Sequence, residues 1–494
     1  MEFAYQIAEQ VRTGRVSVEA TVSAALARAR AVQEEHNAFI TIATEAALAR
    51  ARHLDARIAA GDDIGPLAGV PVAVKDNICT RGILTTAGSR SLATFVPPYN
   101  ATVVERLERA GAVVIAKTNL DEFGMGGSTE NSAFGPAHNP WDKTRVPGGS
   151  SGGSAIAVAA GVVPIALGTD TGGSVRQPAS YNGLIGFKPT YGRLSRYGVV
   201  AFASSLDQVG VLCRSSRDLA LAMDAMGGHD PRDATSLADD TPAFGAGLEP
   251  PHNDLSGLRI GRVRELSGAG NSDGTLAALG RTIDQLEKLG ASVQDVSIPS
   301  ARYGIAAYYL AGPAEASSNL ARFDGMVYST RDGDNSLGQA DVMMRSRGHT
   351  FGPEVRRRIL IGTYALSAGY YDAYYGKALK VRRLLANEIA EAFSQVDLLL
   401  TPTAPRPAYP LGYKIDDPLS MYLDDIDTVL ANLVGIGALS LPAGQAENGM
   451  PSGSQLLAPA LHDERLVQVL GRLEHAIGTD HFAPLAPVAH TLTP

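Results

Sequence analysis

Residues 146–179 read VPGGSSGGSAIAVAAGVVPIALGTDTGGSVRQPA, and this stretch decides the fold that we expect. Two clusters of glycine and serine flank an Ala-rich segment, residues 151–161, and a short apolar segment, residues 162–168. The first segment favours a helix because alanine is the strongest helix former, and the second is typical of a buried strand. A helix followed directly by a buried strand belongs to a sheet whose strands are connected by helices.

The same alternation continues outward from this stretch. Before it, residues 67–78 and 112–117 are apolar runs typical of buried strands, and they enclose an amphipathic helix, residues 102–111, with Gly111 as its stop signal. After it, the pattern predicts strands at 258–263, 291–298 and 396–402, a helix at 275–289 and a long helical region at 354–393. Such alternation indicates an α/β fold with a largely parallel sheet that helices cover on both faces.

The chain reads as a single domain, residues 1–494, with neither an internal repeat nor an obvious linker. Residues 1–60 are predicted to form N-terminal helices, one of them capped by Ser17. Residues 230–256 are rich in Pro, Asp and Gly and therefore indicate a surface loop. The Pro-containing tail, residues 479–494, is predicted to be irregular.

Composition argues against several classes of protein. Of the 494 residues, 45% are hydrophobic and 19% are charged, which suits a globular protein with a large core. The net charge is −8, whereas binding to nucleic acid through a general electrostatic field needs a basic surface. If RNA takes part in the function, we therefore expect a partner to hold most of it.

The cysteines and the N-terminus point to a cytoplasmic protein. Cys79 and Cys213 form no CxxC pair and no Cys/His cluster, which argues against a disulfide framework and a zinc site. The first ten residues, MEFAYQIAEQ, lack the pattern of a signal peptide. The most apolar stretch, Ala155 to Leu167, is too short to span a membrane. We expect a soluble protein of the cytoplasm without membrane contact.

The two Gly/Ser clusters admit several interpretations. Glycine allows close approach of the backbone, its N–H groups can line an anion site, and serine can serve as a nucleophile. A phosphate-binding loop is one alternative, but no GxxxxGK[ST] or GxGxxG pattern occurs here. A Gly/Ser-rich turn without a function is the plain alternative, and it becomes less attractive when two clusters flank one helix–strand unit.

A nucleophile elbow is a further alternative, because GGSSGG satisfies GxSxG around Ser150 and around Ser151. That motif requires a strand immediately before the serine, and here Pro147 and the polar NPWDKTR stretch precede it. None of the ten histidines lies within either cluster, and His138 reads as a loop residue. A Ser-His-Asp triad is therefore disfavoured.

A serine nucleophile without histidine needs another base, and lysine can act as one when burial lowers its pKa. Lys75 stands at the end of the apolar run VPVAV, just before a polar turn. A lysine at a strand end can equally well reach solvent, and the local sequence leaves both interpretations open.

Three motifs decide between these two interpretations of Lys75, because together they resemble a known family. GVPVAVKDNI, GGSSGGSA and GTDTGGSVRQPA occur in this order, with Lys75 lying 75 residues before Ser150 and Ser150 lying 24 before Ser174. In identity and spacing they resemble the amidase-signature family, whose signature core would cover residues 65–215. The resemblance implies an α/β fold around a central mixed sheet, with Ser174 as nucleophile, Ser150 as bridging serine and Lys75 as base.

The resemblance also implies further features of the site. The peptide bond Gly149–Ser150 would be cis, a conformation that non-proline residues adopt only at a cost of roughly 2.5–4 kcal/mol. The backbone N–H groups of Thr171, Gly172, Gly173 and Ser174 would form the oxyanion hole. Asp170 and Arg176 would give structural support to that loop, and no metal is expected.

Four further segments, which include KPTYGRLSRYGVVAFASSLDQVG and ALSAGYYDAYY, resemble one branch of this family, the glutamine-hydrolysing subunits of tRNA-dependent amidotransferases. The others are NLDEFGMGGSTENSAFGPAHNP and EASSNLARFDG. For that branch the resemblance implies glutamine as ammonia donor and a heterotrimer with B and C subunits. It also implies that misacylated tRNA, ATP and Mg²⁺ are bound mainly by the B subunit, so that this chain itself carries no cofactor.

Glutamine carries a carboxylate and an ammonium group, so its pocket needs one fixed cation and one fixed anion. The family positions for these fall on Arg358 and Asp425, and Tyr309 matches a further contact. The sequence departs from the usual pattern just after Asp425, where Leu430 and Gly437 replace prolines. From this sequence it remains open whether the chain is instead a stand-alone amidase for a small or aryl amide, or a catalytically silent assembly subunit.

Overall fold

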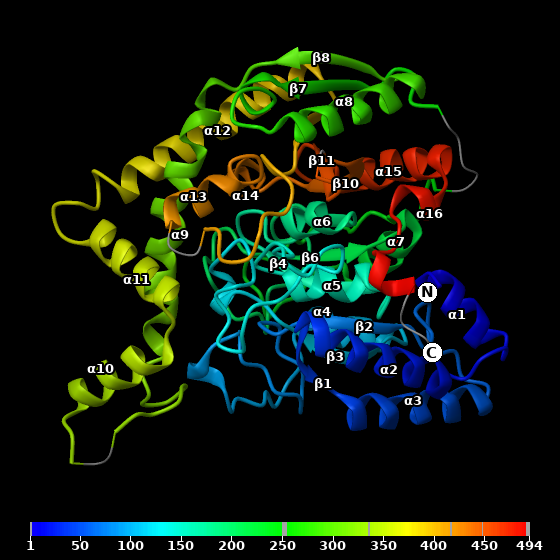
Figure 1. Ribbon diagram of the computed structural model, residues 1–494, viewed down its shortest axis with the longest axis horizontal. Helices are drawn as coiled ribbons and strands as arrows, with labels where there is room; N and C mark the ends of the chain where they lie inside the picture. Colours follow the sequence, from blue (N-terminus) through cyan, green and yellow to red (C-terminus); the bar gives the residue numbers. More distant parts are fainter. Residues whose placement is uncertain (1, 249–253, 334–335, 415–416, 447, 491–494) are drawn as a thin grey trace.

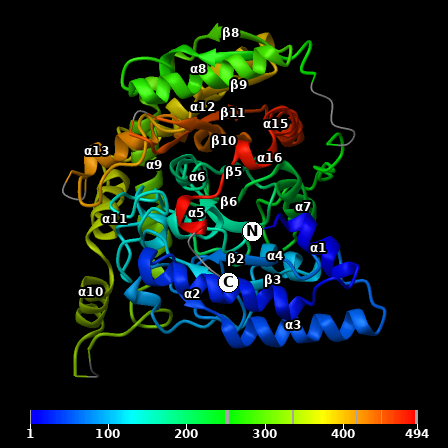
Figure 2. The same ribbon diagram turned by 45° about the vertical axis from the view of Figure 1, so that its right-hand side comes forward.

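The computed structural model of the chain describes residues 2–248, 254–333, 336–414, 417–446 and 448–490, and it is built around one twisted sheet (Figures 1 and 2). In spatial order the strands are β1 (Phe39–Ile42), β3 (Val113–Thr118), β2 (Pro71–Lys75), β4 (Ile165–Asp170), β6 (Gln208–Cys213), β5 (Ile185–Lys188), β10 (Ala438–Gln445), β11 (Pro451–Leu457), β9 (Leu398–Pro402), β7 (Arg259–Val263) and β8 (Ser292–Val296).

Most of the helices pack around this sheet, whereas α10 and α11 lie to one side of it. In chain order they are α1 (Ala4–Arg12), α2 (Val18–His36), α3 (Thr44–Ala59), α4 (Thr102–Arg109), α5 (Gly152–Ala159), α6 (Arg176–Asn182), α7 (Ser216–Met226), α8 (Asp273–Lys288), α9 (Gly304–Asn319), α10 (Gln339–Thr350), α11 (Pro353–Leu366), α12 (Tyr375–Gln395), α13 (Pro418–Tyr422), α14 (Val429–Val434), α15 (Asp463–Ile477) and α16 (Thr479–Phe482).

Seven short 3₁₀ helices complete the described elements: η1 (Arg90–Leu92), η2 (Glu122–Gly124), η3 (Arg264–Leu266), η4 (Pro299–Tyr303), η5 (Leu320–Arg322), η6 (Leu423–Asp425) and η7 (Pro487–His490). In Figure 1, α9 to α12 run down the left-hand side of the molecule, and α10 lies at the lower end of this helical arm. The α/β class with a central sheet is therefore confirmed.

The sheet is mixed, which confirms what the resemblance implied, whereas the expectation of a largely parallel sheet from the strand–helix alternation was wrong. Strands β2, β3 and β4 pair in parallel, as do β7, β8 and β9. Six of the ten described pairings are antiparallel. Five of them arise where β5, β6, β10 and β11 join the two parallel groups, and the sixth pairs the edge strand β1 with β3. The pairing of β5 with β10 brings residues about 250 positions apart into register, such as Gly186 with Ser440, and local pattern gives no information on such pairing.

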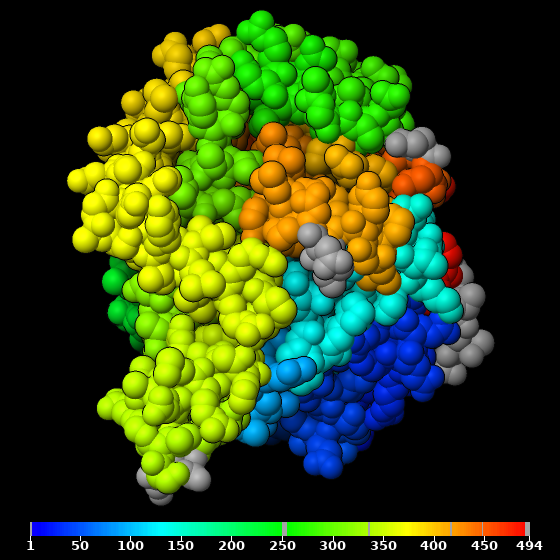
Figure 3. Space-filling view, turned by 60° about the vertical axis from the view of Figure 1, so that its left-hand side comes forward, coloured from blue at the N-terminus to red at the C-terminus, as the bar shows by residue number. Residues whose placement is uncertain are grey.

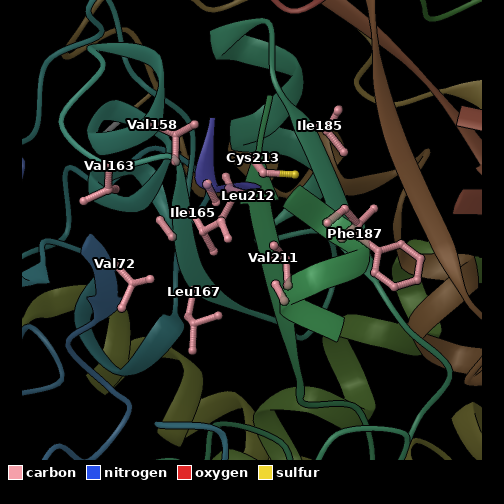
Figure 4. Packing of buried hydrophobic residues seen from close by; sticks show 14 of the residues in the cluster. Val72, Val158, Val163, Ile165, Leu167, Ile185, Phe187, Val211, Leu212 and Cys213 are labelled. Carbon is pink, nitrogen blue, oxygen red and sulfur yellow. The ribbon is translucent and has the colours of Figure 1, made fainter. Parts of the chain in front are cut away.

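The central strands are buried on both faces. Every residue of β2, β3, β4 and β6 is buried, which requires cover above and below the sheet. Figure 4 shows how their apolar side chains interdigitate, with Val72, Ile165 and Val211 from neighbouring strands and Val158 from α5. Burial of such aliphatic side chains stabilises the fold by about 1.5–3 kcal/mol each.

Three segments differ from the sequence-based expectation. Residues 39–42, FITI, form an edge strand within the predicted N-terminal helices, because β-branched residues pair readily with β3. The predicted long helix 354–393 is broken between α11 and α12, where Ser367 to Tyr374 form turns. The tail predicted as irregular contains α16 and η7 in its described part, and Phe482 is buried there.

The predicted surface loop contains no helix or strand in its described parts, residues 230–248 and 254–256. It is nevertheless anchored to the body of the protein, because Asp230 accepts hydrogen bonds from Thr102 and Ser195 and the ring of Phe244 is fully buried. Within the described residues, no helix has the length and apolar character that crossing a membrane requires.

Candidate active site

Lys75 ends β2, and the parallel pairing of β2 with β4 places it beside the loop that follows β4. Its side chain is fully buried. The Nζ atom donates hydrogen bonds to Ser150 Oγ at 2.8 Å, to Ser151 Oγ at 2.8 Å and to the carbonyl oxygen of Thr169 at 3.3 Å. The structure thus brings together the lysine and the first serine of the predicted triad.

Burial lowers the pKa of the Lys75 ammonium to about 7, although the carboxylates of Asp121, Asp170 and Asp207 act in the opposite direction. Removing an ammonium group from water disfavours its charged form. A substantial fraction of Lys75 is therefore neutral near pH ~7, which is the state in which an amine can accept a proton.

Ser150 follows a cis peptide bond with Gly149. The Gly149 N–H donates to Gln177 Oε1 at 3.0 Å, and the Ser150 carbonyl accepts from the N–H of Asp121 at 3.3 Å. Gly124 faces the Ser150 hydroxyl, since a Cβ atom built on Gly124 would lie 3.6 Å from its Oγ. These contacts fix the position of Ser150, the predicted bridging serine, from several sides.

Ser174 lies in the tight turn between β4 and α6, directly after Gly173, whose φ of +140° suits glycine. Its carbonyl oxygen accepts from the N–H of Ser151 at 3.2 Å, so the two Gly/Ser clusters meet there. The residue is 8% exposed, in contrast to the fully buried Lys75. Among the described residues, Ser174 Oγ makes no hydrogen bond.

The loop of residues 171–174 carries the predicted oxyanion hole, and one of its four N–H groups is already engaged. Gly173 N donates to Asp170 Oδ1 at 2.9 Å. The N–H groups of Thr171, Gly172 and Ser174 have no hydrogen-bond partner among the described residues. The N–H groups of Thr171, Gly172 and Ser174 are therefore available to bind an oxyanion. The N–H of Gly173 is not, because it binds the Asp170 carboxylate.

Asp170 and Arg176 hold this loop through a fully buried ion pair. Two guanidinium nitrogens, Nε and a terminal nitrogen, each lie 3.0 Å from a carboxylate oxygen. Arg176 also donates to the Thr428 carbonyl oxygen at 3.0 Å, to Gln455 at 2.9 Å and to Asn432 at 2.7 Å. Burial alone would raise the pKa of Asp170, but the Arg176 guanidinium lowers it to about 2.

The three predicted glutamine contacts also lie together. The Tyr309 hydroxyl donates to Asp425 Oδ2 at 2.8 Å, and the Arg358 guanidinium carbon lies 5.2 Å from the centroid of the Tyr309 ring. Tyr309 comes from α9, Arg358 from α11 and Asp425 from η6. Tyr309 thus contacts one carboxylate and one guanidinium. These are the anion and the cation that could bind the ammonium and the carboxylate of an α-amino acid.

Burial raises the pKa of Asp425 to about 7, although the Tyr309 hydroxyl and Arg358 oppose this shift. A carboxyl group with this pKa is poised to ionise when a cation binds next to it.

Thr428 connects Asp425 to the loop of residues 171–174. Its hydroxyl donates to the Gly172 carbonyl at 2.6 Å and to the Asp425 carbonyl at 3.1 Å. On the other side, the Tyr308 ring packs against Gly172, where an added Cβ atom would overlap it. The predicted chemical residues and the predicted substrate contacts therefore form one continuous site.

Several residues of this site were missed by sequence reasoning. Ser151 contacts Lys75 as closely as Ser150 does, and Asp207 accepts a hydrogen bond from the Thr171 hydroxyl at 2.7 Å. Ser151 could have been noticed as the second serine of GGSSGG. Asp207 lies within SSLDQVG, but nothing in that segment points to a contact with Thr171.

The two positions that depart from the family pattern have a structural account. Leu430 lies in the first turn of α14, and its side chain is buried in the core. Gly437 faces the Asp463 carboxylate, which a Cβ atom at that position would overlap. Asp463 in turn accepts a hydrogen bond from Thr190 N at 2.7 Å. A proline at 437 would therefore require a different placement of Asp463.

A cavity of about 710 Å³ lies beside the site, between α11, the loops around residues 128–133 and 409–414, and α13. Glu354 and Met421 line it, whereas none of Lys75, Ser150 and Ser174 does, so this cavity adjoins the site without containing it. Figure 3 shows this side of the molecule, where the yellow α11 meets the orange segment near residue 420.

The described residues contain no group of three or more His, Cys, Asp or Glu side chains placed to hold a metal ion. Both cysteines are buried and unpaired. His138 Nδ1 lies 2.9 Å from the carbonyl oxygen of Lys143, in a loop.

Comparisons with known proteins place the chain among amidases. The sequence pattern of the family described as Amidase matches residues 20–467. The chain is 55% identical over 479 residues to the A subunit of the Glutamyl-tRNA(Gln) amidotransferase of Deinococcus radiodurans, covering 96% of this chain and 97% of that protein.

Solved structures of similar proteins agree with this placement. The crystal structure of the A subunit of Glutamyl-tRNA(Gln) amidotransferase from Thermotoga maritima matches with a TM-score of 0.77 and 39% identity, covering 96% of this chain and 98% of that one. The structure of 6-aminohexanoate cyclic dimer hydrolase matches with a TM-score of 0.83 and 28% identity, covering 98% and 99%.

Proposed function

The chain belongs to the amidase family, and from this premise we propose that it is the glutamine-hydrolysing A subunit of a tRNA-dependent amidotransferase. It releases ammonia from glutamine for the amidation of Glu-tRNA(Gln), Asp-tRNA(Asn) or both. The identity of 55% to the A subunit of a Glutamyl-tRNA(Gln) amidotransferase, over nearly the full length of both chains, supports this function.

The observation that carries the proposal is the pairing of charges around Tyr309. Asp425 and Arg358 contact the hydroxyl and the face of the same ring. These charges are opposite in sign to the ammonium and the carboxylate of glutamine. A small or aryl amide without such groups would make no use of either charge, so this arrangement favours an amino acid.

In the proposed mechanism, neutral Lys75 accepts the proton of Ser150, and Ser150 accepts that of Ser174. Ser174 Oγ then attacks the side-chain amide carbon of glutamine. The N–H groups of Thr171, Gly172 and Ser174 stabilise the oxyanion, each by roughly 3–4 kcal/mol in comparable sites. The proton returns through Ser150 to the leaving ammonia, and water hydrolyses the glutamyl ester to glutamate and free Ser174.

We assign the remaining steps to partners. A B subunit binds the misacylated tRNA with ATP and Mg²⁺, and a C subunit completes the heterotrimer in the cytoplasm. The acidic character of this chain, with a net charge of −8, supports a division of labour in which another subunit holds the RNA.

Ammonia and glutamate release by the purified chain, alone and with B and C subunits, misacylated tRNA and ATP, tests this function. We expect glutamine hydrolysis that increases with the partners and yields amidated tRNA. Ser174→Ala abolishes it, whereas Ser180→Ala, a buried serine on α6, retains it. Turnover of simple amides without glutamine turnover would indicate a stand-alone amidase, and absence of both would indicate a silent assembly subunit.

A further inference from the structure

Arg358 is held by a glutamate one helical turn before it. Glu354 and Arg358 both lie on α11 and are only 3% and 2% exposed. Arg358 Nε donates to Glu354 Oε1 at 2.7 Å, and the Tyr422 hydroxyl donates to the same oxygen at 2.8 Å. A single carboxylate oxygen therefore fixes both the guanidinium and a neighbouring ring.

Three aromatic rings lie close to the guanidinium. The Arg358 guanidinium carbon lies 5.2 Å from the centroids of Tyr309 and Tyr422 and 5.6 Å from that of Phe202. Tyr309 and Tyr422 stack with centroids 3.9 Å apart and an angle of 21° between the rings. Cations are attracted to ring faces, and the effect is larger where water is excluded.

The hydrogen bonding of Arg358 leaves one edge of the guanidinium open. Among the described residues its only hydrogen bond runs through Nε, and the two terminal nitrogens make none. Those two nitrogens form the fork that binds a carboxylate with two parallel hydrogen bonds. The open edge of the guanidinium is thus a preformed site for a carboxylate. The direction in which this edge points depends on the contacts of Arg358 with Glu354 and Tyr422.

We propose that Glu354 and Tyr422 are positioning residues that aim the open edge of Arg358 at the α-carboxylate of the substrate. They thereby set a preference for an α-amino acid amide over an amide that lacks the carboxylate. This inference rests on the proposed function, because it concerns recognition of glutamine. Neither residue touches the reacting amide, so their effect falls on substrate binding.

The charge of Glu354 agrees with this role. Burial alone would raise the pKa of Glu354, but the Arg358 guanidinium and the Tyr422 hydroxyl lower it below its ordinary value. The second oxygen, Oε2, pairs with Arg357, whose side chain is 41% exposed and lines the neighbouring cavity. Arg357 therefore provides a matched control on the same helix that leaves Oε1 unchanged.

The experiment uses the full chain in complex with its partner subunits and compares two substrates, glutamine and 4-aminobutanamide, which is glutamine without the α-carboxylate. Glu354→Ala is expected to raise KM for glutamine about tenfold or more, the loss typical of a hydrogen bond to a charged group. The value of kcat for glutamine and KM for 4-aminobutanamide are expected to stay unchanged.

Two conservative variants refine the test. Tyr422→Phe keeps the ring stack and removes only the hydroxyl, so KM for glutamine should rise by less than in Glu354→Ala. Glu354→Gln keeps an oxygen that can accept both hydrogen bonds, so KM should return to within about threefold of the parent value. Arg357→Ala should leave KM unchanged.

The outcomes separate this inference from the proposed function. If the parent complex hydrolyses 4-aminobutanamide but not glutamine, the proposed function fails. If the parent hydrolyses glutamine and Glu354→Ala affects both substrates equally, or neither, the positioning role is overturned. An equal loss in Arg357→Ala or in Glu354→Gln would also overturn it, because neither change removes the acceptor that fixes Arg358.

Discussion

The carboxylate of Asp121 occupies the space that a side chain on Gly149 would need. A Cβ atom built on Gly149 would overlap Asp121 Oδ2 and would lie 2.6 Å from Ser128 N. Asp121 cannot move aside, since its carboxylate accepts hydrogen bonds from Thr129 N at 2.9 Å and Asn131 N at 3.1 Å. The absence of a side chain at Gly149 is therefore a condition for the position of Ser150.

Gly149→Ala is expected to lower kcat for glutamine about 100-fold, because a displacement of catalytic atoms by about 1 Å has an effect of this size. Steady-state ammonia release measures it, and circular dichroism monitors the fold. Gly280→Ala on α8 is the control, since a Cβ atom there has nothing within 4 Å. Full activity in Gly149→Ala would show that Ser150 does not need this close packing.

The value of kcat is expected to fall as the pH decreases below about 7, because burial sets the pKa of Lys75 at about 7. Above this pH the amine is neutral and can accept a proton from Ser150, and below it the amine is charged and inactive. Single-turnover acylation between pH ~5 and pH ~9 measures this limb. Lys75→Arg, which stays protonated throughout, should be inactive at every pH. A flat profile would contradict lysine as the base.

Protonation or substitution of Asp425 is expected to change KM for glutamine rather than kcat. Burial raises its pKa to about 7, so acidification neutralises the carboxylate that faces the ammonium of glutamine, and KM rises as the pH falls below about 7. Asp425→Asn should raise KM at neutral pH and remove this pH dependence. An analogue that lacks the α-ammonium should show no such dependence with the parent protein. If its KM followed the same curve, another group would be responsible.

Ser151→Ala is expected to lower kcat by about tenfold or more, because it removes a hydrogen bond to a charged or proton-accepting buried amine. The Ser151 hydroxyl lies 2.8 Å from Lys75 Nζ and so helps to direct it at Ser150. Ser154→Ala, which changes a buried serine on α5, is the control and should keep the parent kcat. Equal kcat in the Ser151→Ala variant would mean that Ser150 alone orients the lysine.

Arg176→Ala is expected to lower the free energy of unfolding by about 3–5 kcal/mol, since it leaves the buried Asp170 carboxylate without its partner. The guanidinium also connects the oxyanion loop to Thr428 and Asn432, so local order should be lost with it. Thermal denaturation measures the effect. Arg52→Ala removes an exposed ion pair with Glu19 and should leave the transition unchanged. Comparable destabilisation by both variants would contradict the importance of burial.

Sequence alone predicted the parts of the fold that depend on local signals. Strands β2, β3 and β4 are short apolar runs, and α4 ends just before Gly111, the predicted stop signal. Strands β10 and β11 were missed, because Pro442 and Gly444 interrupt the first and the second, PSGSQLL, is largely polar and small. Their place between the parallel groups depends on long-range pairing.

The site was predictable where residue identity and spacing define it, and less so where burial defines it. Lys75 and Ser150 were named from motifs, and the structure places them in contact. Glu354 was missed because a glutamate four residues before Arg358 is also the commonest pattern of an exposed helical ion pair. Only the packing of Tyr422 and Tyr309 around this pair reveals that it is interior.

In the proposed mechanism, strands β2 and β4 and their loops carry the chemistry, whereas α9, α11 and η6 carry the proposed contacts to the charges of glutamine. This separation has an evolutionary consequence. Mutations in the later segments can redirect the enzyme to a new amide while the hydrolytic apparatus is inherited intact. The 6-aminohexanoate cyclic dimer hydrolase, which shares this fold at 28% identity, is named for an amide other than the glutamine proposed for this chain.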